Sequence, residues 1–230
     1  MKASLPVLLS VNGGYVDTAG YLALHGLFTT HVTGNFVTLG AALVLGTSGA
    51  VAKLLALPMF CIVVIATRLL SVALAARSAK AGTLALRVLM GIKVALLTLG
   101  AGLAIGLGPF ESGDGWAALL TGMTLVAAMA TQNAIHRIHM STAPPTTIMT
   151  GNTTQIMIDL ADLLRGVPAE ARSAIRSRLS RMSGSVAAFA AGCAAAALIY
   201  AKEDVWCFLI PPIVGGCMLW LRESCDPTPR

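Results

Sequence analysis

The chain has 230 residues, of which 56% are hydrophobic and only 11% are charged, and its mean hydropathy is +0.79. Soluble domains carry about 25% charged residues, so this composition excludes a soluble globular enzyme and a charge-rich disordered protein. The net charge is +6. Its distribution along the chain points to a membrane topology and away from nucleic acid.

Six segments are long and apolar enough to cross a membrane, which takes roughly 20 residues per helix. In chain order they are about 5–28, 55–76, 84–107, 115–136, 183–201 and 205–222. These segments use most of residues 1–230 and leave no room for a separate catalytic domain. The sequence therefore predicts a single all-α, multi-pass membrane domain with about six transmembrane helices.

The positive side chains are distributed unevenly between the two sides of these segments. Twelve fall on one side: Lys2, Arg77, Lys80, Arg87, Arg137, Arg165, Arg172, Arg176, Arg178, Arg181, Arg222 and Arg230. Only Lys53 and Lys202 fall on the other side. Because positively charged loops stay cytoplasmic, we expect both termini to be cytoplasmic. The basic segment 165–181 is expected to contact anionic lipid headgroups.

One short motif occurs twice, 117 residues apart. Residues 29–35 (TTHVTGN) match residues 146–152 (TTIMTGN) at five of seven positions. Each copy follows a segment with a polar centre and precedes an apolar stretch too short to cross, 36–45 and 156–164. An odd number of spans separates the copies, so we expect two three-helix repeats of opposite orientation, about 5–107 and 115–222. Many secondary transporters share this plan.

The Thr-Gly-Asn (TGN) motif has the chemistry of a helix start. A threonine can cap free N–H groups, a glycine lets the backbone approach closely, and an asparagine both donates and accepts. Two such starts meeting at mid-membrane would suit an anion or a carbonyl group. We therefore predict a short re-entrant or broken helix after each motif; an interfacial helix is the alternative. The predicted substrate-binding residues are Thr33, Gly34, Asn35, Thr150, Gly151 and Asn152, together with Gln132 and Asn133 of the fourth segment.

Ionisable residues within spans are costly and usually have a partner. Asp17 and Lys93 both lie near mid-depth, so an Asp17–Lys93 or an Asp17–Arg68 ion pair is predicted. Such a pair would lock the helices or couple an ion to transport. His31, beside the first motif, is a candidate gate or proton carrier because its pKa lies near neutral. The histidines and scattered cysteines form no metal-ligand set, and no metal or cofactor is predicted.

Small residues recur every four positions in the fifth segment, at Gly184, Ala188, Gly192 and Ala196. Such a stripe lets helices approach closely. It fits either internal packing or a homodimer seam.

Four stretches in order resemble the YoaK-like family: Gly14–Leu22, His31–Asn35, Thr131–Ala134 and Met149–Asn152. The family's Gly-φ-x-Asp-Ala start, where φ is aromatic or apolar, has Thr18 in place of its alanine here. The resemblance implies a bacterial multi-pass protein of the inner membrane, with about six helices. The family is grouped under a domain of unknown function, so the resemblance implies no substrate.

The repeat and its two motifs favour a secondary transporter or permease for a small polar or anionic solute. A non-transporting scaffold or assembly protein is the second hypothesis. An intramembrane enzyme that uses His31 or His136 with Asp17 is the third, although the chain lacks the common catalytic and nucleotide-binding motifs, which favours a non-enzymatic function.

Overall fold

The computed structural model describes residues 5–76 and 81–221, which form an all-α structure without strands. The predicted cytoplasmic termini lie outside the described residues, and so do the basic residues Lys2, Arg77, Lys80, Arg222 and Arg230. The helices are α1 (Leu5–Ala23), η1 (Val32–Gly34), α2 (Asn35–Leu45), α3 (Ala50–Ala75), α4 (Ala81–Leu107), α5 (Trp116–His139), α6 (Met149–Arg165), α7 (Ala169–Glu203), η2 (Asp204–Leu209) and α8 (Ile210–Leu221).

Four described stretches are helical, long and apolar enough to cross a membrane: Ala50–Ala75, Gly82–Leu107, Trp116–His139 and Ala169–Leu219. The last one runs through α7, η2 and α8. The first predicted segment is helical as α1, but it contains Asn12, Asp17 and several glycines and falls short on apolarity. The prediction of several helices that are long and apolar enough to span a membrane is thus confirmed for four stretches.

Several predicted boundaries were wrong. The fifth segment, predicted as 183–201, begins at Ala169, because alanines and arginines continue the helix beyond its apolar part. The short stretch at 156–164 belongs to a longer helix, α6, that starts at Met149. In the last segment, residues 204–209 form η2, and α8 starts only at Ile210, with two prolines in its first turn where they cost no hydrogen bond.

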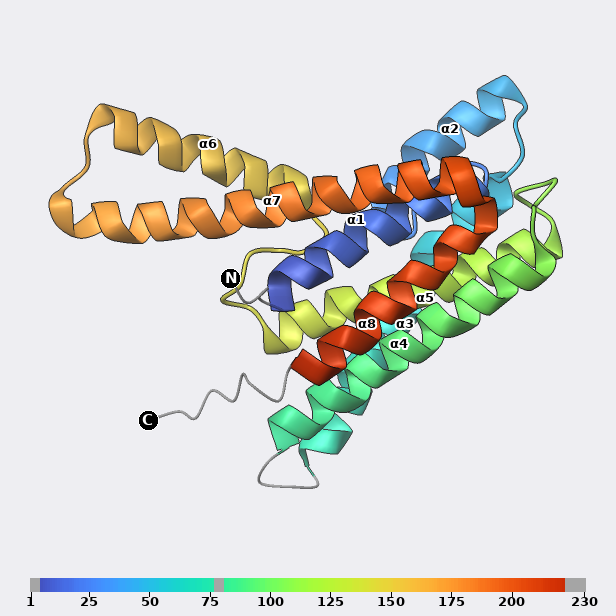
Figure 1. Ribbon diagram of the computed structural model, residues 1–230, viewed down its shortest axis with the longest axis horizontal. Coiled ribbons are helices and arrows are strands. Elements are labelled where there is room, and N and C mark those ends of the chain that lie inside the picture. Colours follow the sequence, from blue (N-terminus) through green and yellow to red (C-terminus); the bar gives the residue numbers. More distant parts are fainter. Residues whose placement is uncertain (1–4, 77–80, 222–230) are drawn as a thin grey trace.

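The helices pack in pairs. α1 lies along α7, and α5 lies between α3 and α4, while α8 contacts α4 and α1 (Figure 1). α6 and the first half of α7 extend from this bundle as a hairpin, and α2 lies toward the opposite end (Figure 1). α1 and α7 are parallel, because Ser10 meets Ser185 and Gly14 meets Phe189. α1 and α5 are antiparallel, because Leu9 meets Gln132 while Leu24 and Leu27 meet Gly122.

Glycines allow α1 and α7 to approach closely. A Cβ atom at Gly192 would lie 2.1 Å from the Val11 carbonyl oxygen, and one at Gly14 would lie 2.2 Å from that of Phe189. Ala188 and Ala196, on the same stripe, are buried in this contact region. The stripe therefore serves internal packing, as one of its two interpretations predicted, whereas Gly184 at its start has no neighbour within 4 Å.

Candidate functional site

The chain turns back on itself after α1. The helix ends at Ala23, yet the Thr30 hydroxyl donates to the Gly13 carbonyl at 3.3 Å and the Thr29 hydroxyl donates to that of Val16. Gly13 lies ten residues, or about 15 Å, before the end of α1. Residues 24–31 therefore return to the middle of the helix before α2 leads away again.

The connection after α5 returns in the same manner. Gln132 donates to the Thr146 hydroxyl at 3.3 Å, and the Thr147 hydroxyl donates to Asn133 at 2.6 Å. A Cβ atom at Gly13 would also lie 3.1 Å from the Thr146 carbonyl oxygen. Both returning segments therefore meet the same point of α1, in the interior of the bundle.

The two asparagines of the TGN motifs form hydrogen bonds within their own loops. Asn35 donates to the Phe28 carbonyl at 2.8 Å and accepts from the Phe28 N–H at 2.9 Å. Asn152 donates to the Pro145 carbonyl at 2.8 Å, and proline has no N–H to complete the pair. Each buried asparagine thus holds its own loop through a hydrogen bond to a residue seven positions earlier in the chain.

The remaining members of the two motifs lie further out. Thr33, Thr150 and Gly151 are exposed, and Gly34 is half-buried. Neither threonine caps its helix: Gly34 precedes α2, Ile148 precedes α6, and neither helix start has a side-chain cap. The expected capping role of the threonines was therefore wrong. The buried threonines of the two repeat copies are the pairs Thr29–Thr30 and Thr146–Thr147 at the head of each copy.

Asp17 has a different partner from the two that were predicted. One carboxylate oxygen accepts the Thr30 N–H at 2.7 Å, and the other lies 2.6 Å from Nδ1 of His31. The predicted ion pairs with Lys93 or Arg68 are absent from the described residues. Asp17 therefore holds the first returning segment, because the fold brings residues 30 and 31 back beside it.

The Asp17–His31 pair borders a cavity of about 300 Å³ between α1 and α7. Its wall is mainly aromatic, with the His31 ring edge-on to Phe189 at a centroid distance of 5.5 Å. Cys193 completes the wall, and its thiol donates to the Gly14 carbonyl at 3.4 Å.

The apolar core has two clusters, and three buried polar residues lie between members of these clusters along the chain. One cluster contains Tyr15, Leu97 and Met129, and the other contains Leu9, Met90 and Ile135. Between these residues lie Asn12 in α1, Lys93 in α4 and Gln132 in α5, which we call the polar layer. They share one level: Gln132 donates to the Leu9 carbonyl, one turn before Asn12.

The register of α4 against α5 places Lys93 in this layer. A Cβ atom at Gly100 would touch the Leu125 side chain, which sets the antiparallel register. Two turns back along α4 is Lys93, and two turns forward along α5 is Gln132, so the two are level. Lys93 lies in the middle of α4, at the depth that the sequence predicted.

Several hydrogen-bonding groups of the polar layer have no partner among the described residues. Lys93 is 0% exposed, and its Nζ has no hydrogen-bond partner there. Both side-chain polar atoms of Asn12 and Oε1 of Gln132 are likewise unpaired. A lysine at the centre of a membrane helix costs about 2.5–3.5 kcal/mol on insertion scales. Such a group is retained against that cost mainly where it has a function.

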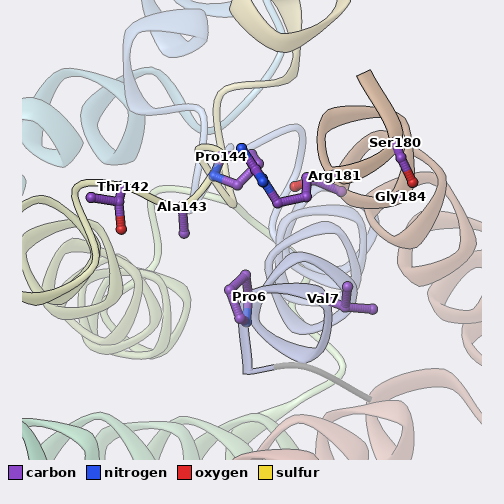
Figure 2. A pocket seen from close by; sticks show the side chains of 9 residues that line it. Pro6, Val7, Thr142, Ala143, Pro144, Ser180, Arg181 and Gly184 are labelled. Atoms are coloured by element: carbon purple, nitrogen blue, oxygen red, sulfur yellow. The ribbon is translucent and has the colours of Figure 1, made fainter. Parts of the chain in front are cut away.

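A cleft of about 540 Å³ opens at the end of the bundle where α1 begins (Figure 2). Pro6 and Val7 line it from α1, Thr142–Pro144 from the second returning segment, and Ser180, Arg181 and Gly184 from α7. In Figure 2 the Arg181 side chain extends from α7 toward Pro144. Val7 precedes Asn12 by five residues, about 7.5 Å along the helix.

Ser185 also lines this cleft, and it pairs with Ser10 of α1, two residues before Asn12. The Ser10 and Ser185 hydroxyls are 2.8 Å apart, and Ser185 also donates to the Pro145 carbonyl at 3.0 Å. Sequence reasoning missed these serines as well as the four buried threonines. The threonines stood in the repeated string and could have been found there, whereas two isolated serines carry no signal.

The charged residues of the α6–α7 hairpin are mostly at its surface. The fully buried Asp159 accepts from Arg178 at 2.9 Å and 2.5 Å, and this hydrogen bonding lowers the pKa of the Asp159 carboxyl. Arg165, Arg172, Arg176 and Arg181 are exposed. Arg68 is exposed on α3, away from the polar layer.

A family comparison covers almost the whole structure. The model of the family described as "Protein of unknown function (DUF1275)" matches residues 5–221. No curated protein and no solved structure matches the chain. The match agrees with the expectation of a domain of unknown function. The chain therefore belongs to the DUF1275 family.

Proposed function

We propose that this protein is a secondary transporter or permease for a small polar or anionic solute. The observation that carries the proposal is the meeting of two broken segments beside Gly13, next to a polar layer with unpaired groups. Irregular backbone deep in a membrane protein is tolerated where it is buried in protein or lines a cavity. Transporters place their solute sites at such breaks.

The contacts of the two halves support an inverted repeat. α1 fastens residues 29–31 as α5 fastens residues 146–147, and α1 runs opposite to α5. When α2 and α6 are counted, the first helix of each half lies along the third helix of the other: α1 along α7, and α5 along α3. Two inverted units that rock against each other would expose the polar layer to either side in turn.

The apolar helices support a location in the membrane, and the YoaK-like resemblance supports the bacterial inner membrane. The proposed orientation places the α6–α7 hairpin and the cleft in the cytoplasm. There the exposed arginines of residues 165–181 would contact anionic lipids. The cleft beside Arg181 would then be the cytoplasmic entrance to the polar layer.

The two rival functions each have an observation in their favour. Asp17, Asn35 and Asn152 all fasten backbone, as a scaffold would require. Asp17, His31 and Cys193 border one cavity, an acid, a base and a thiol that an intramembrane enzyme could use. Against an enzyme using His136, that residue points its ring nitrogen at the Ala143 carbonyl, 3.2 Å away.

The test is solute flux into liposomes that contain the purified protein, over a panel of small anions, neutral polar solutes and cations. The diagnostic variant is Asn12→Leu, because Asn12 has no hydrogen bond in the described structure that leucine would remove. We expect it to be abundant and folded but to lose most flux. The matched control is Thr98→Val, which removes an exposed hydroxyl of α4 that bonds only its own helix.

Two outcomes would contradict the proposal. In the first, no panel member crosses faster than in protein-free liposomes. In the second, Asn12→Leu transports as fast as the Thr98→Val control. Release of a modified lipid by the wild-type protein, at a rate that Cys193→Ala loses, would favour the intramembrane enzyme.

A further inference from the structure

We propose that the polar layer is a binding site for a small monovalent anion. This inference rests on the proposed function and names the class of its solute. Three helices supply the site: Asn12 from α1, Lys93 from α4 and Gln132 from α5. Nitrate, a halide and a short carboxylate belong to this class.

The charge of Lys93 sets the sign of the ligand. Its side chain is completely buried, and no carboxylate of the described residues forms an ion pair with it. The nearest acidic residue along α1, Asp17, lies five residues beyond Asn12 and is engaged by His31 and Thr30. Burial without a counter-ion disfavours the charged form of Lys93, and an anion bound beside it supplies that counter-ion. A cationic solute would instead place two like charges together in a low-dielectric interior.

The number of ionisable side chains in the polar layer sets the valence of the bound anion. Among Asn12, Lys93 and Gln132, only Lys93 can carry a charge, so one negative charge neutralises the site. A divalent anion would leave one charge unpaired at the same depth, with the same desolvation cost. A neutral polar solute would leave Lys93 uncompensated.

The unpaired hydrogen-bonding groups match an anion in kind. Lys93 offers three N–H donors and the Asn12 amide offers two. Oδ1 of Asn12 and Oε1 of Gln132 are unpaired acceptors that can hold the ammonium group in place. The Gln132 amide nitrogen is already bonded to Leu9 and Thr146, so it orients the side chain. Donors remain for a ligand that only accepts.

The cleft supplies an approach of matching charge. Arg181 lies on its wall and is exposed, and Figure 2 shows its side chain directed across the cleft toward Pro144. A positive charge at the mouth raises the local concentration of anions. The Ser10–Ser185 hydrogen bond lies beside the cleft, two residues before Asn12 along α1.

The experiment measures thermal unfolding of the purified full chain in detergent. Sodium chloride, nitrate, formate and sulfate are titrated at constant ionic strength against sodium gluconate, whose anion is large. The variant is Lys93→Met, whose unbranched side chain is one heavy atom shorter and removes the charge. It is expected to fold, because removing an unpaired buried charge removes its desolvation cost. The control is Arg68→Gln, which removes an exposed cation of α3.

We expect at least one monovalent anion to raise the Tm of the wild-type protein. At 100 times its Kd, a ligand raises the Tm by roughly 5–10 °C for a chain of this size. The shift should persist in Arg68→Gln and vanish in Lys93→Met. The proposal is overturned if no monovalent anion exceeds gluconate, if sulfate alone stabilises, or if Lys93→Met responds as the wild type does.

Flux measurements distinguish failure of the anion site from failure of the proposed transport function. If liposomes transport neutral solutes at rates unchanged in Lys93→Met, the anion site fails and the transporter stands. If anions stabilise the protein through Lys93 but no solute crosses, the site stands and the transporter fails.

Discussion

At the residue scale, Asp17 fastens the first returning segment by accepting the Thr30 N–H and pairing with His31. Asp17→Ala would leave a buried N–H without an acceptor, which costs about 1–3 kcal/mol of the free energy of unfolding. Asp17→Asn keeps an acceptor for that group and should lose less. Thermal unfolding in detergent measures both variants, and equal stability of the two would contradict this role.

Because of this structural role, an Asp17 variant does not discriminate between a transporter and a scaffold. Because Asp17→Ala removes a structural contact, low abundance of that variant is expected for a transporter and for a scaffold. Asn12 discriminates between these functions better, since its side chain holds no part of the described structure.

Asp114 caps α3 from a distant loop. Burial opposes its charge, but the N–H groups of residues 49–52 donate to it at 2.8–3.3 Å and lower its pKa below the ordinary 3.8. A lowered pKa adds stability above about pH 4 that is lost as the pH falls through the folded-state pKa. Asp114→Asn keeps one acceptor but removes the negative charge at the N-terminus of α3, so it should cost up to about 1 kcal/mol at pH 7.

The measurement for Asp114 is the Tm of wild type and Asp114→Asn between pH 7 and pH 3. The difference should be roughly 2–4 °C at pH 7 and should shrink below pH 4. A difference that stays constant over this range would show that the charge of Asp114 contributes nothing.

Sequence reasoning located two of the buried ionisable residues, Asp17 and Lys93, but not the partner of Asp17. Asp17 and Lys93 were placed near mid-depth by counting along their helices, and both are buried. The predicted pairing failed because the partner, His31, reaches Asp17 only after the chain folds back. Counting depth along straight spans cannot anticipate such a return.

At the scale of elements, the contact of α1 with α7 depends on glycine. A methyl group at Gly192 would collide with the Val11 carbonyl, so Gly192→Ala should destabilise the protein by about 1–3 kcal/mol through overpacking. Gly184→Ala, on the same helix but with nothing within 4 Å, should stabilise it by up to about 1 kcal/mol. Thermal unfolding of the two variants measures the sign of each change in stability. Equal losses of stability would contradict the close approach of α1 and α7.

The repeated motif predicted where the elements break, but not how the breaks are held. The strings at 29–35 and 146–152, which match at five of seven positions, each span the end of a non-helical connection and the start of the next helix. The motif's asparagines were assigned to a ligand, yet they bind Phe28 and Pro145. The contacts span seven residues through a loop, and no helical or strand period indicates such a spacing.

At the scale of the whole molecule, two long-range relations place the polar layer. The antiparallel register of α4 and α5 brings Lys93 level with Gln132, and the α5–α1 contact adds Asn12. Hydropathy predicted that these helices exist, but it contains no information on which of them are neighbours. That is why Asn12 was not among the predicted site residues.

The proposed transport requires that solutes reach the polar layer through the cleft. The direct measurement is modification of a cysteine at position 12, made as Asn12→Cys after replacement of the native cysteines, by a small anionic methanethiosulfonate in liposomes. Val7→Cys at the cleft is the positive control, since Val7 lines it. We predict that Asn12→Cys is modified, and faster by the anionic reagent than by its cationic counterpart. If Val7→Cys reacts and Asn12→Cys remains unmodified by either reagent, no route reaches the layer and the account is contradicted.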